Sequence, residues 1–368
     1  MPIKILLLSD PNSSHTIKWA RALSQKGFDI FIFGLSTYNE EIYKDYNKVK
    51  VYTLGLQKKK FKGSDLFKLI YLKGLIKLKQ ILKNFRPDIL HAHFASSYGL
   101  LGALSGFHPY ILSVWGSDVY TFPTKSPLHK RVLKYNLIKA DKILSTGHIM
   151  AQEIHKYINK DIEVTPFGID IEVFKPQNVE SYFTEDDIVI GTVKNLEKEY
   201  GIDILIRAFK IVKNTHPNLP FKLLIVGDGS LKKQLQDLVK NLKLEDDTVF
   251  TGFIPHDEVQ KYHNMMSISV FVSNRESFGV SVIEASACEK PVIVSNVGGL
   301  TEVVEDGVTG FVVHARNNQK TAEAIEKLII NKALRIKMGK AGRKRVKELY
   351  NWKNNLQYMI DIYESIRK

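Results

Sequence analysis

Short apolar runs alternate with amphipathic segments along most of the chain, and the pattern occurs twice. In the first half, the runs with the length and apolar content of buried strands are 4–9, 28–34, 88–94, 110–115 and 141–146. In the second half they are 187–193, 221–227, 248–252, 268–273 and 291–295. Most segments between them have helical spacing. Strands separated by helices predict parallel sheets with right-handed crossover connections.

The repeated pattern predicts an α/β protein with two Rossmann-like domains. The segment PFGIDIEVFKP at 166–176 has a proline at each end and a glycine between them, which is typical of a linker. We therefore expect an N-terminal domain at 1–170 and a C-terminal domain at 171–349. The last stretch, 350–368, has apolar residues on one helical stripe and predicts a C-terminal helix.

A dehydrogenase could have the same layout, so the first strand-to-helix turn is informative. It reads SDPNSSHTIKWA, whereas dinucleotide-binding proteins have G-x-G-x-x-G at this place. A dehydrogenase is therefore only a minor alternative.

Two glutamates stand where the strand 268–273 gives way to a helix. Glu276 lies in the predicted loop, and Glu284 lies on the second turn of the helix. In doubly wound sheets such loops lie outside the carboxyl ends of the strands, where ligands bind. The pair is therefore a candidate site, and ordinary solvated charges are the alternative.

The composition is that of a globular protein with an excess of positive charge. Of the 368 residues, 44% are hydrophobic and 25% are charged. The 53 Lys and Arg against 39 Asp and Glu give a formal charge of +14, which indicates nucleic acid, anionic lipid or a phosphorylated substrate as a partner. A single cysteine and an N-terminus without a signal-peptide pattern predict a cytoplasmic protein.

Much of the excess charge lies between residues 58 and 86. This stretch has ten basic residues and one acid, so it contributes 10 − 1 = +9. One face of its predicted helix is apolar and can dock on a sheet. The opposite half mixes cations with apolar side chains: Lys68, Leu69, Leu72, Lys73, Ile76 and Lys77.

Such a mixture favours an anionic membrane surface as the partner. No nucleic-acid-binding motif accompanies the charge, so we expect no nucleic-acid partner. We predict a cytoplasmic protein that associates peripherally with the inner face of the membrane. The alternative is that the three apolar residues pack under a neighbouring loop.

Several separated motifs resemble one family. Glu276 and Glu284 form E-x7-E, and the other motifs, in the family's order and spacing, are SFGVSVIEA, KPVIVSNVGGLTEVVEDGVTGFVV, VGDGS, TGFIP and PFGIDIEVF. In these segments the chain is similar to the retaining glycosyltransferases of GT-B fold that build bacterial surface polysaccharides or lipid-linked glycans. The resemblance implies two Rossmann-like domains that face each other across a cleft. It also implies that the helix at 350–368 packs back on the N-terminal domain.

The resemblance implies transfer of a hexose or N-acetylhexosamine from a nucleotide diphosphate-sugar donor to a glycan acceptor. UDP is favoured over GDP because relatives with SFGVSVIEA often use UDP-sugars, and the basic face favours a lipid-linked sugar as the acceptor. A nucleotide-sugar epimerase of the same fold and a GDP-sugar-dependent transferase are the alternatives. GT-B enzymes act without a metal, and the chain has no D-x-D motif, so we expect no metal and no cofactor.

The resemblance also assigns residues to the donor. Glu284 would accept hydrogen bonds from the ribose hydroxyls, and Glu276 would orient the sugar. The backbone N–H groups of Gly279 and Val280, at the start of the helix, would meet the pyrophosphate. The remaining donor-binding candidates are Phe253, Ile254 and Phe278.

The family's diphosphate clamp is altered in this chain. Asn195 and Tyr200 stand where many relatives have arginine and lysine, but Lys194 and Lys198 lie beside these positions. A diphosphate charge that grows without a metal needs cations to stabilise it. We therefore predict that the two lysines replace the clamp; solvated loop lysines are the alternative.

Two histidines near the end of a strand are candidates for the acceptor side. His91 and His93 share one face of the strand 88–94 because their spacing is two, and both approach its carboxyl end. His93 is the catalytic candidate of the two. Packed histidines with satisfied hydrogen bonds are equally expected.

Two other loops add acceptor-side candidates. Ser14 and His15 stand at a predicted helix start, where they could contact a phosphate. In WGSD, Trp115 occupies the position where many relatives have a histidine near the reacting sugar. A general base is therefore doubtful there, and the alternatives are Asp118 as the candidate or an inert role for this loop.

Overall fold

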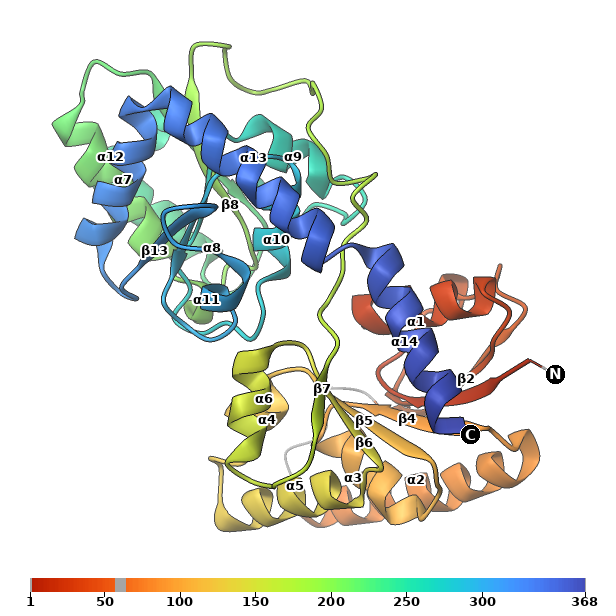
Figure 1. Ribbon diagram of the computed structural model, residues 1–368. Coiled ribbons are helices and arrows are strands. Elements are labelled where there is room, and N and C mark those ends of the chain that lie inside the picture. Colours follow the sequence, from red (N-terminus) through yellow and green to blue (C-terminus); the bar gives the residue numbers. More distant parts are fainter. Residues whose placement is uncertain (1, 57–63, 368) are drawn as a thin grey trace. The chain divides into compact units, whose positions relative to one another are not determined.

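The structure is a computed structural model that describes residues 2–56 and 64–367, with side chains omitted within 64–72. It divides into two compact units (Figure 1): Met1–Pro166 with Asn354–Lys368, called unit 1, and Phe167–Lys353, called unit 2. The boundaries expected from the sequence, at 170 and 350, lie close to these.

Unit 1 is built on a parallel sheet with the strand order β3-β2-β1-β4-β5-β6-β7. Its strands are β1 (Lys4–Leu8), β2 (Asp29–Ser36), β3 (Val49–Leu56), β4 (Ile89–His93), β5 (Tyr110–Val114), β6 (Lys142–Ser145) and β7 (Ile162–Val164). Its helices are α1 (Ser14–Gln25), α2 (Ser64–Phe85), α3 (Ser97–Ser105), α4 (Ser117–Tyr120), α5 (Pro127–Lys139), α6 (His148–His155) and α14 (Trp352–Arg367), which belongs to unit 1 from Asn354.

The two faces of this sheet differ in what they bury. On one face, Leu90 and Ala92 of β4 join a hydrophobic cluster with side chains of α2, α3 and α5, which lie together in one layer (Figure 1). His91 and His93 point to the opposite face because side chains alternate along a strand. On that face α14 packs through Tyr363, whose hydroxyl lies 2.7 Å from His91 Nδ1.

Unit 2 repeats the architecture with the strand order β10-β9-β8-β11-β12-β13. Its strands are β8 (Ile188–Val193), β9 (Phe221–Val226), β10 (Thr248–Gly252), β11 (Ile268–Phe271), β12 (Val292–Ser295) and β13 (Gly310–Val313). Its helices are α7 (Ile202–Thr215), α8 (Lys232–Asn241), α9 (Val259–Met265), α10 (Val280–Ala287), α11 (Leu300–Val303), α12 (Asn318–Ile330) and α13 (Lys332–Leu349). Short 3₁₀ turns cover Glu40–Ile42, Lys198–Tyr200 and Glu245–Asp247.

The predicted fold class, two Rossmann-like parallel-sheet domains, is confirmed. In each sheet the strand order reverses beside its first strand: β1 lies between β2 and β4, and β8 lies between β9 and β11. Ligands of such sheets bind outside the carboxyl ends of the strands at this switch point. The candidate residues are therefore expected at these two switch points. Within the described residues, no helix combines the length and apolar character needed to cross a bilayer.

Candidate active site

Two oppositely charged side chains meet at the switch point of unit 2. Lys194 directly follows β8 and Glu276 follows β11, which are adjacent strands. The Lys194 Nζ lies 2.5 Å from Glu276 Oε2, and the two side chains are only 9% and 13% exposed. The Lys194 ammonium also lies 4.8 Å from the centre of the Tyr200 ring, within cation–π range. Both charged residues were predicted for the site, but their direct ion pair was not.

Two glycines let neighbouring loops approach the backbone of this pair. A Cβ on Gly227 would lie 2.0 Å from the carbonyl oxygen of Lys194, and a Cβ on Gly298 would lie 2.0 Å from that of Glu276. Both glycines also have positive φ, which a side chain would strain. The loops after β9 and β12 thus support the backbone on which Lys194 and Glu276 stand.

The 3₁₀ turn Lys198–Tyr200 is bonded to the segment that precedes Glu276. Asn274 donates its backbone N–H to the carbonyl of Glu199 at 2.7 Å and its side-chain amide to the carbonyl of Lys198 at 2.8 Å. The Lys198 side chain is exposed, and within the described residues it has no carboxylate partner. Its backbone therefore holds the loop, while its ammonium is less constrained than that of Lys194.

The start of α10 offers backbone donors beside Glu276. Gly279 is the N-cap, with φ of 104°, and Val280 is the first helical residue. No side chain caps this end, and the first turn has no acid. The first N–H groups of a helix have no partner within it, so this end attracts anions.

Glu284 lies in the middle of α10 and is almost fully buried, with 2% of its surface exposed. Its Oε1 accepts a hydrogen bond from His256 Nε2 at 2.9 Å, and His263 Nε2 lies 3.6 Å from its Oε2. Burial alone would raise the pKa of this carboxyl, but the two imidazoles lower it to about 2. Glu284 is therefore an ionised hydrogen-bond acceptor at neutral pH.

The sequence analysis missed both imidazole partners of Glu284. His256 is two residues beyond the candidate Ile254 and is 71% exposed, whereas His263 is fully buried. His256 directly follows the candidate motif TGFIP, so the sequence contained a signal for it. His263 lies in α9, and no local motif marked it.

The aromatic candidates of unit 2 divide into an exposed and a buried one. Phe253, in the loop that follows β10, is 75% exposed, and Ile254 beside it is half-buried. Phe278 is buried, and its ring centre lies 5.6 Å from those of both Phe167 and Tyr350. Phe253 can contact a ligand directly, whereas Phe278 packs inside unit 2.

The switch point of unit 1 carries uncharged rings. His93 Nδ1 lies 3.1 Å from the Ser9 hydroxyl, and the His93 ring centre lies 4.4 Å from that of Trp115. His15, in the first turn of α1, stands 5.5 Å from Trp115 on an edge-to-face geometry. Burial lowers the pKa of His93 well below its usual value, and the repulsion it would meet from protonated His91 or His15 lowers it further. His93 is therefore neutral at neutral pH.

Other acceptor-side candidates are held by protein groups. Both ring nitrogens of His91 are engaged, Nδ1 with Tyr363 and Nε2 with the Ser113 hydroxyl, each at 2.7 Å. Burial lowers the pKa of His91 to about 3. The buried Asp118 carboxylate accepts backbone N–H groups at 2.7 Å from Ala95 and from Gly116.

His91 therefore links β4 to β5 and α14, whereas Asp118 connects the loops that follow β4 and β5. The geometry favours the packed-histidine alternative for His91. Ser14, in contrast, is exposed as the first residue of α1, where the sequence predicted a helix start.

Comparison with known proteins identifies the family. The family described as Glycosyl transferases group 1 matches residues 174–345, and Glycosyl transferase 4-like matches residues 4–147. The capsular polysaccharide biosynthesis glycosyltransferase CapM of Staphylococcus aureus is 30% identical over 350 residues, which cover 89% of this chain and 88% of CapM. The chain belongs to the group 1 glycosyltransferases. The N-acetyl-alpha-D-glucosaminyl L-malate synthase of Bacillus anthracis is 27% identical over 305 residues, 79% of this chain and 78% of that enzyme.

Solved structures agree with the fold of this group 1 glycosyltransferase. Anabaena HepE in complex with UDP has a TM-score of 0.80 and 19% identity, over 99% of this chain and 100% of HepE. At this identity the likeness shows the fold, and it confirms the GT-B expectation. The donor, the acceptor and the roles of individual residues stay predictions.

The structure describes only part of the membrane-binding face that the sequence predicted for the glycosyltransferase. The side chains of Lys68, Leu69 and Leu72 lie outside the described residues. Further along α2, Lys73 is exposed and Ile76 is 55% exposed. Lys77 is half-buried, with its ammonium 4.9 Å from the centre of the Tyr52 ring. Ile76 thus does not pack under a loop, which was the alternative.

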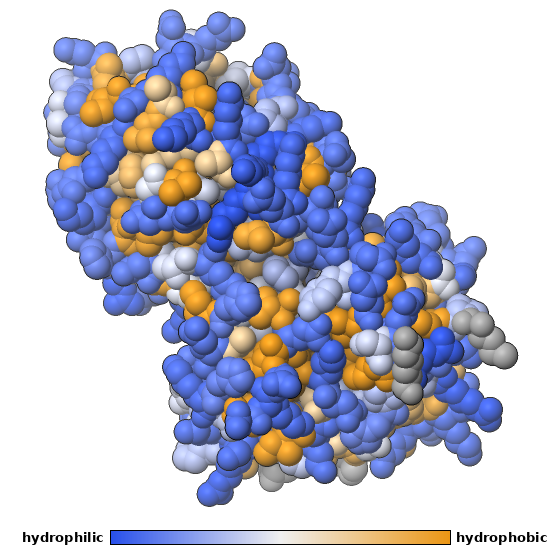
Figure 2. Space-filling view, viewed as in Figure 1, coloured by the Kyte–Doolittle hydropathy of each residue, from blue (hydrophilic) through white to orange (hydrophobic). Residues whose placement is uncertain are grey.

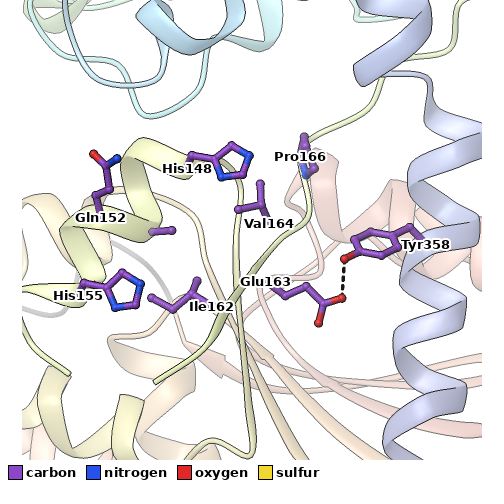
Figure 3. A pocket seen from close by; sticks show the side chains of 9 residues that line it. His148, Gln152, His155, Ile162, Glu163, Val164, Pro166 and Tyr358 are labelled. Atoms are coloured by element: carbon purple, nitrogen blue, oxygen red, sulfur yellow. Dashed lines mark hydrogen bonds between the residues drawn. The ribbon is translucent and has the colours of Figure 1, made fainter. Parts of the chain in front are cut away.

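A pocket of about 670 Å³ lies along β7, the edge strand of unit 1 (Figure 3). His148 and His155 of α6 line one side, and Tyr358 of α14 lines the other. The Tyr358 hydroxyl donates to Glu163 Oε1 at 2.6 Å, and Lys142 Nζ lies 2.5 Å from Oε2. The Lys142 ammonium is therefore neutralised by Glu163 and is not available to an anionic ligand in this pocket. Among the described residues, no cluster of His, Cys, Asp and Glu is suited to hold a metal ion.

Proposed function

We propose that this group 1 glycosyltransferase is a retaining enzyme that moves a hexose or N-acetylhexosamine from a UDP-sugar to a lipid-linked glycan, without a metal, at the cytoplasmic face of a membrane. Several relatives support this choice. CapM is named for capsular polysaccharide biosynthesis, and the Bacillus anthracis relative for N-acetylglucosaminyl transfer. HepE has been solved with UDP and with UDP-glucose.

The observation that carries the proposal is the ion pair of Lys194 and Glu276 beside the open start of α10. A diphosphate would meet the Lys194 ammonium together with the N–H groups of Gly279 and Val280. Glu276 would then accept hydrogen bonds from hydroxyls of the transferred sugar. Lys194 would thus hold the diphosphate and Glu276 the transferred sugar, and their ion pair would keep both side chains in place. Lys198 would add a second, more mobile positive charge.

The nucleoside half of the donor would bind around Glu284. This carboxylate is ionised, and two ribose hydroxyls are suitable donors to its oxygens. The His256 imidazole, which occupies Oε1, is largely exposed and can move aside or bond the ribose in turn. Phe253 and Ile254 offer an apolar surface to the base, and Phe278 supports the loop by packing.

In the proposed transfer, the bond between the anomeric carbon and the β-phosphate oxygen breaks. The acceptor hydroxyl oxygen forms the new bond on the same face, and its proton passes to the departing phosphate oxygen. Negative charge grows on the diphosphate during this step, so prearranged cations and helix N–H groups lower the barrier. No protein base is needed, which agrees with a tryptophan at position 115.

The acceptor would bind at the uncharged rings of unit 1. A neutral His93 can orient a sugar hydroxyl, and Ser14 and His15 can contact the acceptor's phosphate. His91 and Asp118 would act indirectly, because their polar atoms are already bonded to β5 and α14 and to neighbouring loops, respectively.

A product assay tests the proposal. The purified enzyme is incubated with UDP- or GDP-sugars and a membrane-lipid extract in excess EDTA, and released nucleoside diphosphate and the labelled lipid product are measured. We expect UDP release coupled to label in the lipid fraction, and NMR should show the donor's anomeric configuration retained. Conversion of the donor without acceptor would indicate an epimerase, and strict dependence on added divalent metal would contradict the proposed mechanism.

The membrane part is tested separately by vesicle sedimentation. The wild type should bind anionic vesicles, bind neutral vesicles poorly, and bind more weakly at high salt. Lys73→Glu with Lys77→Glu should weaken binding. Equal recovery of wild type and variant in the supernatant would refute membrane binding through α2 and leave the transferase activity intact.

A further inference from the structure

The outer face of α5 exposes a row of large apolar side chains. Leu128, Tyr135 and Ile138 are 66%, 38% and 49% exposed. At about 100° per residue, these three fall within an arc of about 80° on the helix surface. The inner face already buries Leu133 and Leu137 in the core of unit 1. The exposed row is therefore not part of the folded core.

The helix and the segment before it carry positive charge that no carboxylate balances. From residue 119 to residue 140 the chain has five cations and no acid. Within the described part of the chain none of the five pairs with a carboxylate: Lys125, Lys130, Arg131, Lys134 and Lys139. Other exposed lysines of this protein do form such pairs, for example Lys320 with Glu323 at 2.8 Å. Cations around an apolar row are typical of helices that lie in a membrane interface.

A pocket of about 450 Å³ adjoins the end of this helix. Lys134 and Ile138 of α5 line one side, and the segment after α6 adds Lys156 and Lys160. The Lys160 ammonium donates to the carbonyl of Ile138 at 2.6 Å, at the negative end of the helix. The Lys156 ammonium is paired with Glu153, and that of Lys160 with backbone carbonyls. The pocket thus combines an apolar wall with the Lys134 ammonium, which has no carboxylate partner among the described residues and suits the phosphate of a lipid headgroup.

The position of α5 agrees with a membrane partner. α3 contacts both α2 and α5, so the three helices cover the same face of the sheet (Figure 1). Figure 2 shows apolar patches among charged side chains on the visible face of unit 1. A second copy of the chain is a poor partner, because a symmetric contact would place the unpaired cations of two α5 helices against each other.

We propose that the outer face of α5, with the pocket beside its C-terminal end, binds anionic lipid at a membrane surface. The row of Leu128, Tyr135 and Ile138 enters the interface, and the flanking cations meet lipid phosphates. The proposal rests on the proposed membrane-associated function for its setting, but on different residues from those of α2.

Charge and apolar variants of α5 test the proposal on the full chain. Lys130→Glu with Lys134→Glu, and separately Leu128→Ser with Ile138→Ser, are compared in sedimentation with vesicles of phosphatidylcholine alone or with one third phosphatidylglycerol. We expect each pair to lower partitioning onto anionic vesicles at least tenfold. Only the charge pair should change the salt dependence. All four substituted side chains are exposed. The melting temperatures of the variants should therefore stay near that of the wild type.

A matched control comes from another basic helix. Lys337 and Lys340 of α13 are exposed on either side of Ile336, which is 48% exposed. Lys337→Glu with Lys340→Glu makes the same change in net charge as the α5 pair. It should leave vesicle binding within about twofold of the wild type, since α13 lacks the apolar row. An equal loss in this control would show that net charge alone drives binding and would overturn the proposal.

A fluorescence experiment shows which helix enters the lipid. Tyr135→Trp and, separately, Ile76→Trp place a reporter on α5 or on α2. With anionic vesicles we expect a blue shift and quenching by brominated lipid for the α5 reporter. Quenching at position 76 with none at position 135 would overturn the α5 proposal while supporting α2.

The outcomes separate this inference from the proposed function. Vesicle binding that depends on α5, in an enzyme without glycosyl transfer, would support the inference and contradict the proposed function. Full glycosyl transfer with no vesicle binding would support the proposed transferase activity and contradict both the inference and the membrane part of the proposed function. If the α5 variants bound vesicles normally but changed the sedimentation coefficient, the face would be an interface between copies and the proposal would be wrong.

Discussion

The two units have the same sheet topology, but their switch points differ in chemistry. At β8 and β11 of unit 2, Lys194 and Glu276 form an ion pair, and Glu284 is held ionised nearby. At β1 and β4 of unit 1, His93 and Trp115 pack as uncharged rings. One fold thus presents charge in one unit and neutral aromatic surface in the other.

This difference follows from the loops, since the strands below both sites are apolar and buried. A charged switch point suits a diphosphate, whose binding depends on cations and helix ends. A neutral aromatic switch point suits the flat apolar faces and hydroxyls of a sugar. The comparison therefore supports donor binding on unit 2 and acceptor binding on unit 1.

Acid should destabilise the two units in different pH windows, and this is the largest effect we expect. The pKa of His91 is about 3 in the fold, below its ordinary 6.5, so its contribution is complete above pH 6.5 and is lost as the pH falls toward 3. The pKa of Glu284 is about 2, below 4.5, so its contribution, about 3 kcal/mol at most, is lost between pH 4.5 and 2.

Calorimetry of the full chain at pH 7, 5 and 3 checks these windows. His91→Gln should lose less stability than the wild type between pH 7 and 5, and Glu284→Gln should lose less between pH 5 and 3. If both variants followed the wild-type profile, the pKa assignments would be wrong.

Removal of the cation from the charged switch point should have the next largest effect. Lys194→Ala leaves Glu276 unpaired in a mostly buried place and takes one cation from the diphosphate. We expect a fall in kcat/KM for the donor of at least a hundredfold, about 2.7 kcal/mol. Steady-state kinetics at saturating acceptor measure it. Unchanged donor kinetics would remove Lys194 from the proposed clamp.

The two carboxylates should each matter somewhat less. Glu276→Gln and Glu284→Gln keep the shape of the side chain but lose the charge, and each should lower activity at least tenfold, about 1.4 kcal/mol. Glu284→Gln should raise the KM for donor, because in the proposed site Glu284 would contact only the nucleoside half. Wild-type turnover in either variant would contradict the site assignment.

Unit 1 should show the complementary pattern. His15→Ala removes the edge-to-face contact with Trp115 and a candidate acceptor contact. We expect the acceptor KM to rise about fivefold, a change of about 1 kcal/mol, with no change in donor hydrolysis. A change in the donor KM instead would contradict the assignment of the acceptor to unit 1 and the donor to unit 2.

The smallest effect is expected for Lys198→Ala. Its ammonium is exposed, so its attraction to the diphosphate is weakened by solvent. We expect a two- to fivefold rise in donor KM, about 0.4 to 1 kcal/mol. Lys198 serves as the matched control for Lys194, and equal losses in both variants would show that the ion pair has no special role.

The sequence pattern predicted the interior of both sheets better than their edges. Buried parallel strands such as β4 and β8 are continuous apolar runs, which are visible in a sequence. The strands β3, β7 and β13 were missed, and all three lie at sheet edges. β3 has only one fully buried residue, Val49, while β7 and β13 have only three and four residues. An edge strand has a neighbouring strand on one side only and is less buried than an interior strand. Its apolar pattern in the sequence is therefore weaker.

For the sites, the chain itself determined which residues stand at the carboxyl ends of strands. The order of strand, loop and helix places Lys194, Glu276 and Glu284 there, and the spacing of two puts His91 and His93 on one face. These relations are local, and local periodicity fixes the direction of side chains. The motifs around Glu276 and Glu284 likewise indicated the family.

Only the tertiary structure decided which of these residues meet. Lys194 and Glu276 are 82 positions apart, and His91 and Tyr363 are 272 apart. His263, which no motif marked, reaches Glu284 from another helix. Such contacts depend on which strands become neighbours and which helix covers them. That choice comes from packing of the whole core, so no local pattern in the sequence contains it.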